Sequence, residues 1–164
     1  MKADLDRIDV KLVQGLQDAA RISNQDLAEQ VGLSPSACLA RVRRLEQEGV
    51  IRRYLADVAI ARLGSSLEVF AEVTLSNHTP GDFRHFEQTA AKIPEIVEMF
   101  QLSGAFDYLL HVVCRDMTHY RELNDALTNG KHGVEKVVSH VVMAESKPFS
   151  GYPIRSIVPA DEPA

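Results

Sequence analysis

The chain has 164 residues, of which 45% are hydrophobic and 25% charged, a composition that indicates a folded globular protein and excludes a disordered one. No apolar run approaches the roughly 20 residues that cross a bilayer, and the polar start has no signal-peptide core, so we expect a cytoplasmic protein without membrane contact. A formal net charge of −5 excludes a chain that is basic throughout.

The charge is divided unevenly along the chain. Residues 1–64 carry ten lysines and arginines against nine acidic residues, whereas residues 65–164 carry eight against fourteen. Six of the ten basic residues in the first part lie between Arg41 and Arg62. Because salt screens charges beyond roughly 10 Å, a local cluster matters more for phosphate contact than the total charge does. We therefore expect the first part to contact DNA and the acidic part to face away from it.

Three short helices are predicted in the first 48 residues. Apolar residues recur at spacings of three and four over residues 5–16, the pattern of an amphipathic helix. Ser23 is the predicted N-cap of a second helix, which Gly32 ends in a left-handed conformation. Ser34 and Pro35 then give a new cap and first turn for a helix that runs to about residue 48. Two helices joined by a tight, glycine-containing turn make a helix-turn-helix.

The third predicted helix has the pattern of a recognition helix. At about 100° per residue, one side collects the residues that would pack on the first two helices, namely Cys38, Leu39, Val42 and Leu45. The other side begins with small residues, which let a helix enter the major groove, and continues with Arg44 and Gln47, while Arg41 and Arg43 lie on the flanks. Arginines at such positions bind phosphate or guanine. The helix N-terminus can also donate N–H groups to a phosphate. The predicted DNA-binding residues are Ser34, Ser36, Ala37, Ala40, Arg41, Arg43, Arg44 and Gln47.

The remainder predicts a second domain. Residues 50–58 have the composition of a wing or connecting strand, and residues 62–66 form the expected boundary. Strands are predicted at 67–75, 96–102, 108–114 and 134–143, and helices at 80–93 and from 117 to about 129. This β-α-β-β-α-β order is that of a ferredoxin-like unit. The expected α+β organisation is a helix-turn-helix domain in 1–64, a ferredoxin-like domain in 65–147 and an irregular tail in 148–164.

Five short sequence motifs occur in a fixed order along the chain. They are Leu5-Asp6-Arg7-Ile8-Asp9, Arg21-Ile22-Ser23-Asn24, the run from Val31 to Glu46, Ser103-Gly104-Ala105-Phe106-Asp107-Tyr108-Leu109-Leu110, and Val141-Val142-Met143. This set resembles the Lrp/AsnC family of prokaryotic feast/famine regulators, over nearly the whole chain up to about Phe149. The resemblance implies a sequence-specific DNA-binding transcription regulator whose second domain senses a small effector, such as an amino acid. It also implies dimers that associate into tetramers or octamers.

The turn between the predicted strands 96–102 and 108–114 is the candidate effector site. Gly104 permits backbone angles closed to other residues and lets a ligand approach the main chain. Exposed N–H groups in such a turn can bind a carboxylate, and Asp107 can pair with an ammonium group. From the residues alone, an ordinary hairpin turn capped by Asp107 is the more usual interpretation. The family resemblance implies effector binding at Ser103, Gly104 and Asp107, although Ala105 stands where leucine-responsive members often carry an acidic residue.

Other functions remain open at this point. The arginines of the third helix are alternatively a solvated face paired in part with Glu46 and Glu48. A DNA-architectural protein would act by assembly alone, and enzymes that decarboxylate the tetrapyrrole sirohaem resemble the same two-domain family. We expect no enzyme, cofactor or metal, because the chain has no Ser-His-Asp or phosphate-loop pattern and its cysteines and histidines lack metal-ligand spacing. The small residues and arginines of the third helix favour the regulator.

Overall fold

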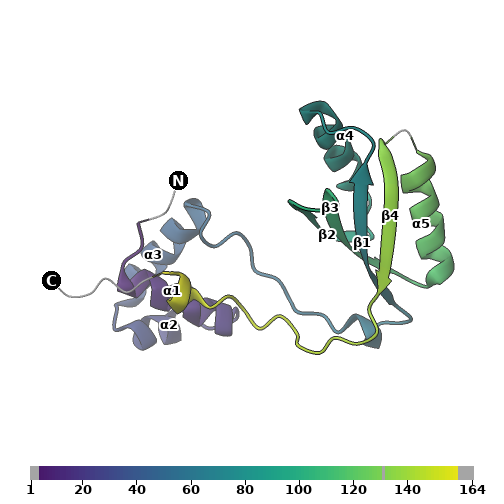
Figure 1. Cartoon of the computed structure of the whole chain (residues 1–164). Coiled ribbons are helices and arrows are strands. Elements are labelled where there is room, and N and C mark those ends of the chain that lie inside the picture. The colour runs from purple at the N-terminus through teal and green to yellow at the C-terminus, as the bar shows by residue number, and fades with distance from the viewer. Residues whose placement is uncertain (1–3, 131, 159–164) are drawn as a thin grey trace. The chain divides into compact units, whose positions relative to one another are not determined.

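The computed structural model describes residues 4–130 and 132–158, which form two compact units (Figure 1). The first unit contains the chain up to Asp57 together with the segment from Pro148, and the second contains Val58–Lys147. Residues 58–64, which the sequence assigned to the first domain, therefore group with the second unit. The tail from residue 148, expected to be irregular, groups with the first unit and contains a short helix, α6 (Ile154–Ile157).

The first unit is built from three helices, which are α1 (Arg7–Asp18), α2 (Asn24–Val31) and α3 (Pro35–Gln47). The hydroxyl groups of Ser23 and Ser34 accept backbone N–H groups in the first turns of α2 and α3, as predicted. Gly32 ends α2 with a φ of 71°, in the left-handed region that favours glycine. The buried core consists of Leu12, Leu27, Ala28, Cys38 and Leu45. The predicted helix-turn-helix is confirmed.

The strand expected at residues 50–58 does not form. The N–H groups of Val50 and Ile51 both donate to the Leu45 carbonyl, at 2.9 and 3.1 Å, and the two side chains pack on the core of the first unit. Residues 52–59 are irregular and lead into the 3-10 turn η1 (Ile60–Arg62). Strand-like composition was misleading here because β propensity depends on a neighbouring strand, and no strand among the described residues pairs with this segment.

The second unit has the predicted ferredoxin-like order. Its elements are β1 (Leu67–Leu75), α4 (Pro80–Ala90), β2 (Ile96–Gln101), β3 (Tyr108–Cys114), α5 (Met117–Asn129) and β4 (Val134–Val141). The strands form one antiparallel sheet in the order β2-β3-β1-β4. In the centre, Val69 of β1 is opposite Val112 of β3 on one side and Val141 of β4 on the other.

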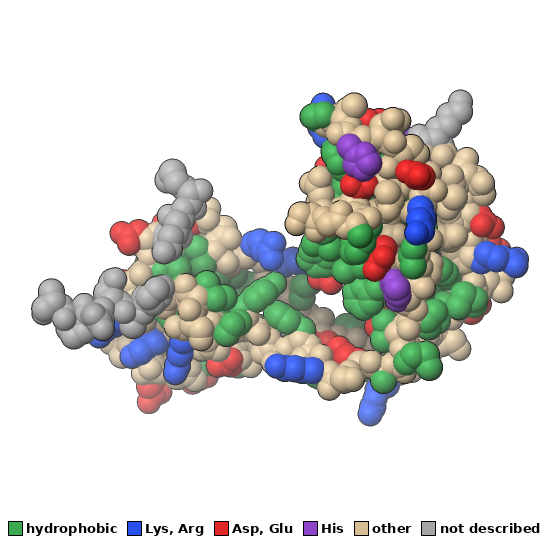
Figure 2. Space-filling model, viewed as in Figure 1, with side chains coloured by type: hydrophobic (Ala, Val, Ile, Leu, Met, Phe, Trp, Pro, Cys, Tyr) green, Lys and Arg blue, Asp and Glu red, His purple; other side chains and the backbone are tan. Residues whose placement is uncertain are grey.

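Helices α4 and α5 cover one face of this sheet. Phe86 of α4 and Leu123 of α5 pack against alternate strand residues, because successive side chains of a strand point to opposite faces. The buried strand residues are Val69, Ala71, Val73, Leu75, Tyr108, Leu110, Val112, Cys114 and Val134. Neither helix packs on the opposite face, which we name the open sheet face; it carries Glu68, Phe70, Glu72, Leu109, His111, Val113, Val138 and His140. Figure 2 shows hydrophobic side chains gathered over the strand region, with acidic and histidine side chains among them.

Candidate DNA interface and effector site

Helix α3 is held in place from its start. Asn24 Nδ2 in α2 donates to the Pro35 carbonyl at 2.8 Å, and the Ser34 hydroxyl accepts the Ala37 N–H at 3.3 Å. Cys38 and Leu45, both fully buried, fix the inner side of α3 in the core of the first unit. These contacts determine the rotation of α3 about its axis, so its opposite side forms a defined surface.

This outer side carries six of the eight residues predicted to bind DNA. The exposed residues are Ser34, Ser36, Ala37, Ala40, Arg43 and Gln47. Side chains in the first two turns are short, and the first exposed cation, Arg43, follows further along the helix. Short side chains at the N-terminal end permit close approach to base edges in a major groove.

The other two predicted residues, Arg41 and Arg44, are tied to α1. Arg41 Nη1 donates to Asp6 Oδ2 at 2.6 Å and to Asp9 Oδ1 at 2.9 Å, and Arg44 Nη2 donates to Asp9 Oδ2. The Asp9 side chain is 1% exposed, whereas those of Arg41 and Arg44 remain 32% and 42% exposed. The carboxylates that bind these two arginines are therefore Asp9 in α1 and Asp6 at its N-cap, and not Glu46 and Glu48 as the solvated-face alternative expected.

Helix geometry explains why Arg41, which the sequence placed on a flank of α3, reaches the carboxylates of α1, and why the assignment of Leu39 to the buried side was wrong. Arg41 lies about 60° around the helix from the buried Cys38, whereas Leu39 lies about 100° away. Arg41 is thus nearer the buried side, and Leu39, predicted to be buried, is 39% exposed. Two long side chains therefore reach back to α1 from the flank of α3.

Asp9 is the residue of this site that sequence reasoning missed. Asp9 lies in the first turn of α1, where the helix dipole favours an acidic residue, so its charge alone does not indicate a further role. It also follows Leu5 by four residues and precedes Leu12 by three, which places it on the apolar stripe of α1. A buried carboxylate needs a cation or hydrogen-bond donors. This position in the stripe was the available signal.

The pKa shifts in this cluster follow from its ion pairs. Hydrogen bonds to Asp6 and Asp9 raise the pKa of Arg41, and the hydrogen bond to Asp9 raises the pKa of Arg44. Partial desolvation acts to raise the pKa of Asp6, but hydrogen bonds from the Asp9 N–H and from Arg41 outweigh it and lower the pKa below its ordinary value. Arg41, Arg44 and Asp6 are therefore all charged at neutral pH.

In the turn between β2 and β3, Asp107 is fixed by the sheet. Its N–H donates to the Val73 carbonyl at 2.9 Å, and its carbonyl accepts the Leu102 N–H at 2.9 Å. Its carboxylate accepts the Leu75 N–H at 2.7 Å and lies 3.2 Å from His78 Nε2. With these partners, Asp107 acts as a structural cap that holds the turn against β1.

The tip of the same turn is open. Gly104 has a φ of 137°, and no atom lies within 4 Å of the position that a β-carbon would occupy. Ser103, Gly104 and Ala105 are all exposed. A ligand can therefore approach the main chain at Gly104 without displacing a side chain.

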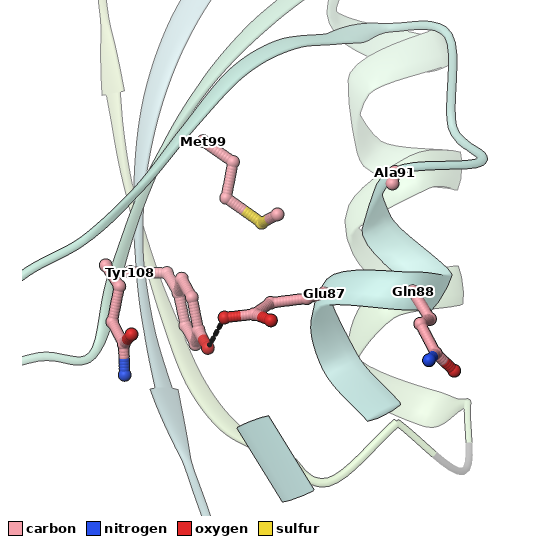
Figure 3. A pocket seen from close by; sticks show the side chains of 6 residues that line it. Glu87, Gln88, Ala91, Met99 and Tyr108 are labelled. Carbon is pink, nitrogen blue, oxygen red and sulfur yellow. Dashed lines mark hydrogen bonds between the residues drawn. The ribbon is translucent and has the colours of Figure 1, made fainter. Parts of the chain in front are cut away.

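A cavity of about 340 Å³ lies between α4 and the β2–β3 hairpin (Figure 3). Its lining consists of Glu87, Gln88, Ala91, Met99, Gln101 and Tyr108. The Tyr108 hydroxyl donates to Glu87 Oε1 at 2.9 Å, and burial together with this carboxylate raises the pKa of Tyr108. Gln101 and Tyr108 are opposite one another in the ladder and flank the turn at 102–107. Sequence reasoning did not find this cavity, because its lining comes from separate elements.

Among residues 4–130 and 132–158, no three histidine, cysteine or acidic side chains are grouped so as to hold a metal ion. In the same residues, no helix is long and apolar enough to pass through a bilayer.

Known proteins match both units. Residues 5–52 match a winged helix-turn-helix DNA-binding domain, and residues 68–152 match the Lrp/AsnC ligand binding domain. The leucine-responsive regulatory proteins of Escherichia coli strain K12 and Klebsiella pneumoniae are each 44% identical over 144 residues, which is 88% of this chain and 88% of theirs. The chain belongs to the Lrp/AsnC family. This Lrp/AsnC protein is therefore a transcription regulator with a helix-turn-helix DNA-binding domain and a ligand-binding domain.

Solved structures of Lrp/AsnC regulators share the fold. A transcriptional regulator from Neisseria meningitidis in complex with L-methionine has a TM-score of 0.85 at 32% identity, covering 94% of this chain and 100% of its own. An AsnC family transcriptional regulator from Agrobacterium tumefaciens has a TM-score of 0.84 at 29% identity, with the same coverage. The fold class and the family predicted from the sequence are both confirmed.

Proposed function

We propose that this Lrp/AsnC regulator is a cytoplasmic, non-enzymatic protein that reads specific DNA sequences through α3 and responds to an amino acid. The observation that carries the proposal is the outer side of α3, where small side chains are followed by the exposed Arg43. The inner side of the same helix is packed into the core of the first unit, which fixes the orientation of the outer side. Ser36, Ala37 and Ala40 approach base edges, and Arg43 and Gln47 contact bases or phosphate. Ser34, with the helix N-terminus, binds phosphate, and so do Arg41 and Arg44.

Equilibrium DNA binding tests this assignment. The probes are a duplex enriched from a random-sequence library by the unaltered protein and a scrambled duplex of the same composition. Arg43→Ala should weaken binding to the enriched duplex by about 1–3 kcal/mol and reduce discrimination between the two. Arg121→Ala, which removes an exposed arginine from α5, is the matched control and should bind like the unaltered protein. Equal affinities for all three proteins would show that α3 is not the reading surface.

We further propose that the effector is an amino acid bound at Ser103, Gly104 and Asp107. Support comes from the open backbone at Gly104, where N–H groups of the tip can receive a carboxylate, and from the turn that Asp107 holds in shape. The relatives are named for leucine, and the Neisseria meningitidis regulator was solved with L-methionine, so these two amino acids are the first candidates. The cavity beside the turn is the alternative location.

Calorimetric titration with L-leucine and L-methionine separates the two locations. Gly104→Ala places a methyl group on the open backbone at a φ that favours glycine, and should weaken effector binding. Ala91→Phe fills the cavity from an exposed position on its edge, and should leave binding unchanged. Unchanged binding by Gly104→Ala together with weaker binding by Ala91→Phe would place the effector in the cavity. If neither amino acid binds, and a screen of the other common ones also fails, the DNA-architectural alternative is favoured.

We also propose that a second copy of the chain covers the open sheet face. Phe70 stacks on His111 there, with ring centroids 4.7 Å apart, and is opposite His140 on the other neighbouring strand. Leu109, Val113 and Val138 are apolar side chains of this face that α4 and α5 leave uncovered. A two-fold dimer would bury this face and present two α3 helices to a pseudo-palindromic site. Tetramers or octamers would follow by further association of dimers.

Light scattering tests this assembly. Phe70→Glu places a charge in the centre of the open sheet face and should shift the protein toward the 18.2 kDa monomer. Lys92→Glu, at an exposed position after α4, should not. An unaltered protein that stays monomeric at micromolar concentration would contradict the proposal.

A further inference from the structure

We infer that Asp9 is a positioning residue for DNA binding: its buried carboxylate fixes the side chains of Arg41 and Arg44 where their remaining N–H groups can meet phosphate. The inference rests on the proposed contact of α3 with DNA and adds to it a residue on a different helix.

The Asp9 carboxylate is fully engaged. Oδ1 accepts from Arg41 at 2.9 Å, and Oδ2 accepts from Arg44 and from the Asp6 N–H, the latter at 3.1 Å. Only the contact with the Asp6 N–H is needed to cap α1. The other two join the helix that precedes the helix-turn-helix to the flank of α3, and both are made by a side chain that is 1% exposed.

Arg41 and Arg44 are held in place by Asp6 and Asp9 but keep N–H donors that could bind phosphate. A guanidinium group has five N–H donors, and the contacts with Asp6 and Asp9 use one nitrogen of each arginine. Arg44 Nε is buried and finds no hydrogen-bond partner among the described residues. The ion pair with Asp9 therefore decides the conformation of Arg44, at the expense of one of its own donors.

Whether DNA affinity rises or falls when the Asp9 carboxylate is removed distinguishes a positioning role from simple charge neutralisation. A carboxylate beside two DNA-binding arginines also repels phosphate, so its removal should strengthen DNA binding if charge is all that matters. A positioning role predicts weaker binding. In the unaltered protein, Asp9 already fixes the arginine side chains on folding, whereas without Asp9 their rotamer freedom would be lost only when DNA binds, and this entropy loss would reduce the affinity. The two accounts thus differ in sign.

Asp9→Asn is the decisive variant, since it keeps the shape and the acceptor for the Asp6 N–H but removes the charge that holds both arginines. Asp18→Asn, which removes a carboxylate near the other end of α1 that accepts from Gln14, is the matched control. Both are compared with the unaltered full chain on the enriched duplex, across a salt series, with circular dichroism to establish folding. We expect Asp9→Asn to bind about tenfold more weakly. Its salt slope should fall by about one to two, as one or two phosphate contacts are lost. Asp18→Asn should bind at least as tightly as the unaltered chain.

Equal or tighter binding by folded Asp9→Asn would overturn the inference. If Asp9→Asn fails to fold, Asp6→Asn replaces it, because asparagine can still accept the Asp9 N–H. Asp6 is 51% exposed and contacts only one of the two arginines, Arg41 at 2.6 Å, so we expect a smaller loss of the same sign. No loss in folded Asp6→Asn would then count against positioning. If neither the unaltered protein nor Asp18→Asn binds any duplex, the proposed function itself fails and the inference falls with it.

Discussion

The side-chain amide of Gln17 in α1 brackets the main chain of Tyr152 in the C-terminal tail. Gln17 Nε2 donates to the Tyr152 carbonyl at 2.9 Å, and Gln17 Oε1 accepts the Tyr152 N–H at 2.8 Å. The neighbouring Gly151 has a φ of 104°, and a β-carbon there would lie 2.6 Å from the Gln17 amide. The tail is therefore docked on α1 by a paired hydrogen bond that requires a glycine beside it.

Gln17→Ala is expected to release the tail. The variant loses two hydrogen bonds, each of which contributes about 0.5–1.5 kcal/mol to the docked state. Limited digestion with chymotrypsin should then cleave after the exposed Phe149 faster than in the unaltered protein. Gln14→Ala is the control, because the Gln14 amide donates to Asp18 on the same helix. Equal cleavage rates in both variants would show that docking does not depend on Gln17.

Arg44→Ala should cost stability as well as DNA binding. The exposed position assigned from the sequence implied that the fold would tolerate this change. Because Arg44 is one of two cations on the buried Asp9, we expect its removal to lower the free energy of unfolding by about 1–3 kcal/mol. Urea unfolding measures this loss. Arg43→Ala, at an exposed position on the same helix, should change stability little; equal losses in the two variants would contradict the role of Asp9.

The stability of the first unit should depend on Asp6 at acid pH. Desolvation opposes the shift, but the Asp9 N–H and Arg41 lower the pKa of Asp6 from its ordinary value of 3.8. A carboxyl with a lowered pKa contributes its full stability above the ordinary value and loses it as the pH falls through the folded-state pKa. Below about pH 4, the free energy of unfolding should therefore fall more steeply in the unaltered protein than in Asp6→Asn. The same dependence of the unfolding free energy on pH in both proteins would contradict this prediction.

The two cysteines should report on the two units separately. Cys38 and Cys114 are 0% and 4% exposed, and burial raises the pKa of both thiols. Because the thiolate is the reactive form, neither should react with Ellman's reagent until its unit unfolds. With Cys114→Ala, the remaining thiol follows unfolding of the first unit in increasing urea; with Cys38→Ala, it follows the second. Rapid labelling of the native protein would show that these sites are not closed.

Features decided by neighbouring residues were predictable from the sequence. The caps at Ser23 and Ser34, the end of α2 at Gly32 and strand Leu67–Leu75 occur where they were expected, because each depends on a local hydrogen bond or on period-two burial. The strand at 50–58 failed because a strand also needs a partner, which composition does not show.

The candidate sites were predictable only in part, for the same reason. Gly104 marked the open turn correctly, since the need for a positive φ is a property of one residue. The ion pairs of Asp9 join residues 32 and 35 positions apart, and the contact of Asp107 with Leu75 joins residues 32 apart. Such pairs arise from packing of whole helices and strands, which the spacing of charges along the chain does not encode.

The first unit is assembled from both ends of the chain, with all of Val58–Lys147 between them. On the ribosome, Gln17 is made early and Tyr152 late, so helices α1 to α3 leave the exit tunnel long before the tail that docks on them. Domains generally fold as units during synthesis, so we expect the core of the helix-turn-helix to form before the tail is made. Its last contact, however, closes only once the ligand-binding domain has been translated. A docked tail thus shows that the ligand-binding domain has already been made, because a nascent chain that stops short of residue 152 cannot form this contact.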